Sequence, residues 1–298
     1  SDFFNSEIDI LKSLKKVYKK IKITPRGDKL LLEGENTDIL KLCVVLDSLI
    51  YFLKQNENLN ESNLNQIIEG KGDKLLKPES GRVILFGTNK KKIKAHTLNQ
   101  IKIIEAFENN DMVFAIGPAG TGKTYTGVAL AVKALKDKDV KRIILTRPAV
   151  EAGENLGFLP GDLKDKLDPY MQPLYDALKE MIQIEKLDDY IKRGIIEIAP
   201  LAYMRGRTLD NAFVILDEAQ NTTENQMKMF LTRMGKKAKF MITGDPGQID
   251  LPKSSMSGLK QANVLLQKID GIDIVYLDGS DVIRHKLVRS IIDAYNTK

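Results

Sequence analysis

The spacing of hydrophobic positions changes along the chain, and the first seventy residues mix two periods. Segments 17–23 and 29–33 resemble strands and flank a Pro-Arg-Gly-Asp sequence at 25–28, which predicts two strands joined by a turn. Apolar residues recur at helical spacing over 37–53, after a threonine that can cap a helix, and a shorter helix is predicted over 62–69. Residues 1–70 are therefore expected to form a small α+β module.

From residue 95 onward, short apolar runs alternate with segments of helical periodicity. The expected strands are 112–116, 142–146, 195–199, 213–216, 239–243 and 273–277. These runs are apolar at nearly every position, which is typical of parallel strands covered on both faces. The sequence therefore predicts an α/β fold with a parallel sheet over residues 95–298, joined to the first module by a basic connector over 71–94. The lysine tract 90–94 either contacts phosphates or is a solvated linker, and the linker is favoured on base rates.

The eight residues that follow run 112–116 read Gly-Pro-Ala-Gly-Thr-Gly-Lys-Thr, which fits the phosphate-loop pattern G-x-x-x-x-G-K-[ST] at every fixed position. A strand before the loop and a helix after it aim the helix N-terminus at the bound anion. Lys123 is suited to the β- and γ-phosphates and Thr124 to Mg²⁺. We therefore expect ATP and Mg²⁺ as cofactors. The expected nucleotide-binding residues are Gln100, Gly117, Pro118, Ala119, Gly120, Thr121, Gly122, Lys123, Thr124 and Tyr125.

Two further strand ends carry polar residues that complete this site. Ligands of open α/β sheets bind at the carboxyl ends of the strands, so Asp217 and Glu218 are expected beside the loop. Asp217 is expected to hold Mg²⁺ together with Thr124, and Glu218 to orient or deprotonate water, which favours hydrolysis. Gln248 is suited to sensing the γ-phosphate, and the amide of Gln100 can read an adenine edge.

These segments resemble the PhoH family of P-loop ATPases, which are similar to the first motor domain of superfamily 1 helicases. The matching segments are 99–100, 117–124, 146–154, 156–161, 204–208, 217–221, 244–248 and 281–285. The resemblance spans residues 95–296 and implies a RecA-like core in which Gln100 recognises adenine. The first module also resembles the family's N-terminal region, with a KH-like pattern that lacks a Gly-x-x-Gly loop.

The resemblance also implies roles for four arginines. Arg147 would face nucleic acid or a neighbouring subunit, and Arg205, Arg207 and Arg284 are candidates for an arginine finger or sensor. Arg284 is preferred, because a helix that is capped by a residue at 280 or 281 would hold it in place. The expected catalytic residues are Lys123, Glu218, Gln248 and Arg284.

A single phosphate loop and a single Asp-Glu-Ala-Gln segment occur, whereas a superfamily 1 helicase places ATP between two motor domains. The other wall of the site is therefore expected from another copy of the chain, in a closed ring that we take to be a hexamer. Segment 150–189 is long enough for subunit contacts or for a loop that faces the pore of the ring.

Composition and charge set the remaining expectations. The chain has a net charge of +6, and most of the excess lies in residues 1–96, which hold 18 Lys or Arg against 13 Asp or Glu. A basic surface of this kind favours RNA or single-stranded DNA as a partner. The alternative is that these lysines and arginines are ordinary solvent-exposed residues. Long apolar runs and a signal-peptide pattern are missing, so no membrane contact and a cytoplasmic location are expected. One cysteine, Cys43, and two histidines make zinc unexpected.

Three functions remain open at this point. The first is an ATPase that acts on RNA or single-stranded nucleic acid. The second is a P-loop kinase or nucleotide switch, against which Glu218 and Gln248 argue. The third is an assembly ATPase that acts on protein partners.

Overall fold

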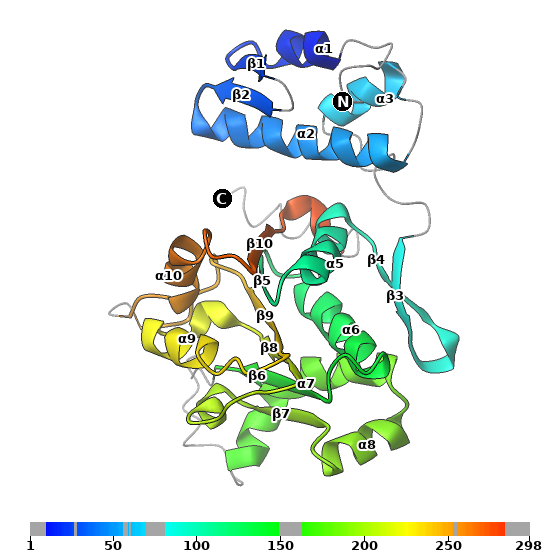
Figure 1. Ribbon diagram of the computed structural model, residues 1–298, viewed down its shortest axis with the longest axis vertical. Coiled ribbons are helices and arrows are strands. Elements are labelled where there is room, and N and C mark those ends of the chain that lie inside the picture. The colour runs from blue at the N-terminus through cyan, green and yellow to red at the C-terminus, as the bar shows by residue number, and fades with distance from the viewer. Residues whose placement is uncertain are drawn as a thin grey trace, which may run out of the picture. The chain divides into compact units, whose positions relative to one another are not determined.

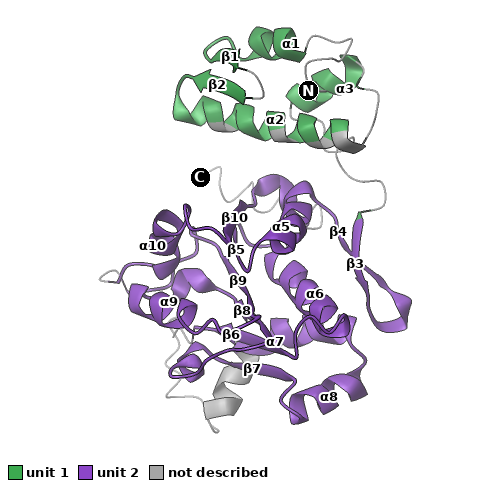
Figure 2. Ribbon diagram, in the orientation of Figure 1, with its two compact units in different colours: residues 1–81 green, residues 82–298 purple. Residues whose placement is uncertain are grey.

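The computed structural model describes residues 10–26, 29–55, 59, 61–69, 81–148, 163–252 and 255–283 of the 298. It divides into two compact units, Ser1–Gly81 and Arg82–Lys298 (Figure 2). None of the helices within the described ranges has the length and apolar composition that crossing a lipid bilayer requires.

The first unit is a small α+β structure around its own core. Its elements are α1 (Ile10–Val17), β1 (Lys22–Arg26), β2 (Lys29–Glu33), α2 (Asn36–Gln55) and α3 (Glu61–Ile68). Strands β1 and β2 form an antiparallel hairpin. Leu14, Leu42, Leu49 and Leu64 are almost fully buried in a core that all three helices contribute to. This confirms the two predicted helices.

The strand predicted over 17–23 is wrong for its first half. Helix α1 extends to Val17, and β1 begins only at Lys22. Ile10 and Leu14, four residues apart, are buried on one face of α1, whereas Val17 is exposed. Residues 18–21 form the turn that connects α1 to β1, so only the last two residues of the predicted strand are extended.

The basic connector predicted over 71–94 is also wrong for the part that the structure describes. Strands β3 (Arg82–Phe86) and β4 (Lys92–Ala95) form an antiparallel hairpin that belongs to the second unit. A short 3-10 turn, η1 (Thr88–Lys90), forms its tip. Ile93 and Ala95 are buried at alternate positions of β4, whereas the neighbours Ile84 and Leu85 are both buried because the register of β3 is irregular between Val83 and Leu85.

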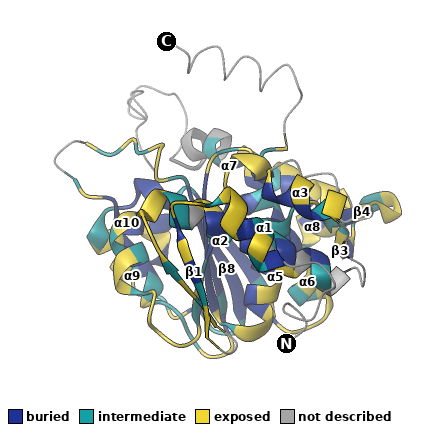
Figure 3. Ribbon diagram, turned by 90° about the horizontal axis from the view of Figure 1, so that it is seen from above, coloured by how far each residue is buried: buried dark blue, intermediate teal, exposed yellow. Residues whose placement is uncertain are grey.

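The second unit is built on a six-stranded parallel sheet in the order β10-β5-β9-β8-β6-β7 (Figure 1). Its strands are β5 (Met112–Ile116), β6 (Arg142–Arg147), β7 (Ile196–Pro200), β8 (Ala212–Leu216), β9 (Lys239–Gly244) and β10 (Ile272–Tyr276). All six lie within one residue of the predicted runs. The prediction of an α/β, doubly covered parallel sheet is confirmed, and the strands show as the buried centre of Figure 3.

Helices cover both faces of this sheet. They are α5 (Leu98–Asn109), α6 (Lys123–Lys136), α7 (Leu163–Met181), α8 (Ile184–Lys192), α9 (Glu224–Leu231) and α10 (Gly258–Leu265). Helices α5 and α6 lie on one face, and α9 and α10 on the other (Figure 1). Phe114 and Phe240 of the sheet pack with Phe230 and Leu259 of these last two helices in one buried cluster. The carboxyl ends of β5, β8 and β9 consequently meet at one edge, where the predicted site lies.

Candidate nucleotide-binding site

The phosphate loop connects the end of β5 to the start of α6, as predicted. Gly120 has a φ of 82° and Gly122 a φ of 77°, a left-handed conformation that side-chain-bearing residues rarely adopt. A Cβ atom at Gly117 would lie 2.4 Å from the carbonyl oxygen of Leu277. The loop therefore needs glycine for two different reasons, backbone conformation and close packing.

Two side chains from distant segments hold this loop. Asp245, after β9, accepts a hydrogen bond of 3.1 Å from the amide of Ala119. Gln100, on α5, donates from Nε2 to the carbonyl of Thr121 at 2.8 Å and accepts at Oε1 from the amide of His96 at 2.7 Å. Gln100 is 2% exposed, and both ends of its amide are committed to main-chain groups. The structure thus places Gln100 under the loop and does not offer its amide to a base.

This placement gives a test of the role of Gln100. Gln100→Leu leaves the buried carbonyl of Thr121 unpaired, at a cost of about 1–3 kcal/mol, and also removes the acceptor of the His96 amide. We expect it to lower the stability of the domain and to weaken the binding of ATP and GTP alike, measured by chemical denaturation and by nucleotide titration. Selective loss of ATP, with GTP binding and stability unchanged, would instead assign Gln100 to adenine.

Lys123 is the first residue of α6 and is 8% exposed. Its ammonium donates hydrogen bonds of 2.7 Å to the carbonyls of both Gly117 and Pro118, so the charge lies within the curve of the loop. Burial lowers the pKa of Lys123, and the nearby carboxylates, Asp245 first, oppose that shift. A phosphate group in the loop would replace weak carbonyl acceptors with full negative charge.

Asp217 lies at the end of β8 and is 2% exposed. Its Oδ1 accepts hydrogen bonds from the hydroxyls of Thr124, at 2.6 Å, and Thr243. Its Oδ2 accepts from Nε of Arg147, at 2.8 Å, and from Nη2 of the same guanidinium. The structure therefore brings together the two predicted metal ligands, and it adds a threonine from β9 and an arginine from β6.

Glu218 follows in a left-handed backbone conformation, with a φ of 54°. Its Oε2 accepts a hydrogen bond of 2.6 Å from Nε2 of Gln220, whose Oε1 accepts in turn from the amide of Asp245 at 3.0 Å. Gln220 thus fixes the Glu218 carboxylate relative to the loop after β9. Gln220 and Asp245 were not predicted as site residues, although each comes shortly after a buried strand, which is a usable signal.

These groups line one cavity of about 460 Å³. Its lining includes Gly120, Lys123, Thr124, Tyr125, Arg147, Asp217, Glu218, Asp245 and Gln248, together with Pro173, Asp176, Ala177 and Glu180 of α7. Gln248 is exposed at the rim. Tyr125 donates to Glu180 at 3.1 Å, and burial together with Glu180 raises the pKa of Tyr125 to about 12. The phenol therefore stays a neutral donor at the wall formed by α7.

The four arginines predicted to act at a nucleotide site lie in different places. Arg147 lines the cavity, whereas Arg205 and Arg207 are not among the described residues around it. Arg205 is exposed, and Arg207 forms a two-bond pair with Glu197, at 2.6 and 2.7 Å, which raises the pKa of Arg207. Arg284 lies outside the described residues. A role of these three in a neighbouring copy's site stays a prediction.

The helix expected to hold Arg284 lies outside the described residues, but Ser280 and Asp281, the residues expected to cap it, are part of a described turn. Asp278 caps the short 3-10 turn η5 (Gly279–Asp281) by accepting from the amide of Ser280. Asp281 is buried and accepts from Nδ2 of Asn99 at 2.8 Å, which ties this segment to α5.

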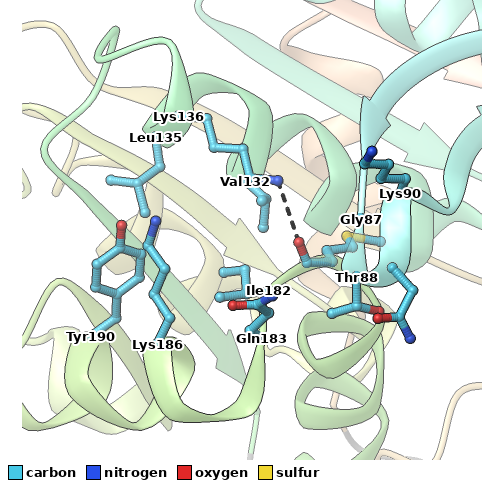
Figure 4. A pocket seen from close by; sticks show the side chains of 12 residues that line it. Gly87, Thr88, Lys90, Val132, Leu135, Lys136, Ile182, Gln183, Lys186 and Tyr190 are labelled. Carbon is cyan, nitrogen blue, oxygen red and sulfur yellow. Dashed lines mark hydrogen bonds between the residues drawn. The ribbon is translucent and has the colours of Figure 1, made fainter.

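A second cavity, of about 420 Å³, lies at the other end of α6 (Figure 4). The hairpin tip, the end of α6 and the α7–α8 junction surround it, and Lys90, Lys136 and Lys186 are among its lining residues. Lys136 donates to the carbonyls of Phe86 and Met181, at 2.9 and 3.4 Å. The ammonium of Lys186 lies 5.4 Å from the ring centre of Tyr190. No carboxylate belongs to the lining that the structure describes.

The first cavity fits a magnesium nucleotide. A glycine-lined turn supplies backbone amides, and Thr124 and Asp217 supply the oxygen ligands that Mg²⁺ prefers. The described chain holds no cluster of three or more His, Cys, Asp or Glu that could bind a metal alone. Mg²⁺ here would therefore take most of its ligands from phosphate and water, as is usual at phosphate loops.

A parallel sheet with this loop after one strand and a threonine-bonded aspartate after another defines a P-loop nucleotide-binding fold. The family model for the PhoH-like protein matches residues 92–296. The chain belongs to this PhoH-like family.

Known relatives agree with this assignment. The chain is 49% identical over 296 residues to the PhoH-like protein of Bacillus subtilis, covering 98% of this chain and 92% of that one. It is 45% identical over 199 residues to Protein PhoH of Escherichia coli, covering 66% and 56% of the two chains. Among solved structures, a Pif1 helicase from Candida albicans is similar with a TM-score of 0.38 and 14% identity. That match covers 68% of this chain but only 44% of the helicase.

Proposed function

We propose that the chain is an ATPase that uses Mg²⁺ to hydrolyse ATP. The main support for this proposal is that one cavity is lined by Lys123, Thr124, Asp217 and Glu218. Within it, Thr124 is hydrogen-bonded directly to Asp217. Loop amides and Lys123 bind the phosphates, and Thr124 with Asp217 holds the metal, which neutralises charge that develops on the phosphates. Phosphate release from Mg·ATP, absent when Mg²⁺ is chelated, is the expected result.

Glu218 is the proposed acceptor of the proton of the attacking water. Its neighbour Gln220 holds one carboxylate oxygen at 2.6 Å, which leaves the other available for the attacking water. Gln248, which also lines the cavity, is proposed to contact the terminal phosphate or that water. A carboxylate held in one orientation fits a base better than a freely rotating one.

We further propose that ATP turnover acts on RNA or single-stranded nucleic acid. The support is the second cavity, whose described lining includes Lys90, Lys136 and Lys186 and no carboxylate (Figure 4). Burial and then Lys186 lower the pKa of Lys136, so the cations of Lys136 and Lys186 repel each other and an anion beside them is favoured. Phosphate groups of a nucleic-acid backbone match such a site.

The double variant Lys90→Ala, Lys186→Ala tests this surface. Single-stranded RNA should bind more weakly, and the slope of log affinity against log salt should fall by about 1.4, since each single-strand phosphate contact contributes about 0.7. ATP binding should be unchanged. The matched control is Lys192→Ala, Lys237→Ala, which removes two lysines that do not line the cavity. An equal salt slope in the variant and the wild type would exclude the second cavity as the nucleic-acid site.

We also propose that the chain forms a homo-oligomeric ring, taken as a hexamer. Val264 and Leu265 of α10 are 74% and 65% exposed, which gives the second unit an apolar surface for a subunit contact. Native mass spectrometry with Mg·ATP should show a closed oligomer that Val264→Glu, Leu265→Glu dissociates. A monomer with full ATPase activity would rule out a shared active site.

A further inference from the structure

Arg147, which was expected to face nucleic acid or a neighbouring subunit, is instead bonded to a residue of its own site. It ends β6, and Asp217 follows the paired strand β8, so the two side chains leave adjacent strand ends. The amide of Asp217 donates to the carbonyl of Thr146 at 2.9 Å, which fixes this register. The guanidinium then reaches Oδ2 of Asp217 through both Nε and Nη2.

All the acceptor capacity of Asp217 is engaged by this arrangement. Two hydroxyls occupy Oδ1, and two guanidinium N–H groups occupy Oδ2. The side chain of Arg147 is 14% exposed and that of Asp217 is 3% exposed, so the ion pair is poorly screened by water. A Mg²⁺ ion at Thr124 would bring two positive charges beside this guanidinium and compete with it for Asp217.

A displaced guanidinium would have a new partner close by. Arg147 lines the same cavity as Lys123, Glu218 and Gln248, where the terminal phosphate of a bound nucleotide would lie. A guanidinium binds phosphate oxygens through two parallel N–H groups, as it binds a carboxylate. Mg·ATP therefore offers a metal that takes the old partner and a phosphate that replaces it, whereas Mg·ADP offers the metal alone.

The same guanidinium also contacts α7. Its Nη1 donates to the carbonyl of Tyr170, and α7 continues along the cavity wall to Glu180. Glu180 in turn bonds Tyr125 of the phosphate-loop helix and Lys91 of the hairpin, at 3.1 and 2.7 Å. A shift of Arg147 would therefore release a carbonyl in the middle of α7, a helix whose last turn is tied to the hairpin through Glu180.

We propose that Arg147 is a nucleotide sensor that acts within its own chain. It pairs with Asp217 before Mg·ATP binds, moves to the terminal phosphate when Mg²⁺ takes Asp217, and thereby releases its bond to α7. The proposal rests on the proposed ATP site but assigns the sensing of the terminal phosphate to a residue of the same chain.

Nucleotide titrations of Arg147→Met test this sensor. The variant should bind Mg·ADP at a Mg²⁺ concentration several-fold lower than the wild type, because the metal no longer competes with a guanidinium. The ratio of its affinities for Mg·ATP and Mg·ADP should fall about tenfold, which is a typical effect of losing one charge-assisted contact. Arg82→Met is the matched control, since Arg82 forms ion pairs with Glu105 and Glu108 and does not line the cavity.

Equal weakening of Mg·ADP and Mg·ATP by Arg147→Met would overturn the proposal, because Arg147 would then only hold Asp217 in place. If that variant does not fold, hydrogen exchange of wild-type α7 decides. Amide exchange in α7 should increase with Mg²⁺ and a non-hydrolysable ATP analogue, and it should stay unchanged with ADP in the absence of Mg²⁺. Identical exchange in these two states would contradict the proposed role of Arg147. A wild type that binds no nucleotide would instead refute the proposed function itself.

Discussion

Lys123→Ala is expected to reduce ATP turnover by at least about 10²-fold, the usual cost of losing one preorganised charge at a transition state. Nucleotide affinity should fall as well, because the ammonium is the cation that lies within the curve of the loop, 2.7 Å from two of its carbonyls. Steady-state phosphate release and nucleotide titration measure the two effects separately.

Lys136→Ala is the matched control for this variant. Lys136 lies on the same helix and also donates to two main-chain carbonyls, but it lines the second cavity. Its removal should leave ATP turnover in the absence of nucleic acid within about twofold, a difference of less than 0.5 kcal/mol in the barrier. Wild-type turnover by Lys123→Ala would refute the assignment of this loop as the catalytic site.

Glu218→Gln is expected to bind Mg·ATP with nearly wild-type affinity and to hydrolyse it about 10²- to 10⁴-fold more slowly, the range attributed to a general base. The substitution keeps the size of the side chain and its acceptor for Gln220, while Asp217 and Thr124 remain to hold the metal. Rapid-quench measurement of bound ATP and ADP separates the chemical step from product release.

Glu224→Gln provides the comparison, since Glu224 starts α9 and does not line the cavity. Its rate should match that of the wild type. Loss of Mg·ATP binding by Glu218→Gln would mean that Glu218 holds the metal and that the roles given to the two carboxylates must be exchanged.

The sheet could be read from the sequence because its strands are buried on both faces. A run such as 213–216 is apolar at every position, and this marks a central strand without reference to any partner. Segments with one wet face were harder to assign. The lysines near Val17 and those of the hairpin at 82–95 are solvent-facing residues of ordered elements, and they obscured a helix end and a pair of strands.

Local sequence likewise identified some residues of the candidate site, whereas contacts between distant segments could not be predicted from it. Lys123, Thr124 and Asp217 each lie next to a recognisable strand, so local pattern was sufficient to identify them. The partners of Gln100 and Arg147 depend on which chain segments meet at the edge of the sheet. Gln100 bonds a carbonyl 21 positions away and Arg147 a carboxylate 70 positions away, and no local spacing encodes either contact.

The most direct measurement is the identity of the nucleotide bound after incubation with excess Mg·ATP, determined by chromatography of the denatured complex. We expect ADP and released phosphate for the wild-type chain, and intact ATP on Glu218→Gln. Intact ATP on the wild type, or the same ADP fraction and rate in both proteins, would contradict the claim that this site hydrolyses ATP through Glu218.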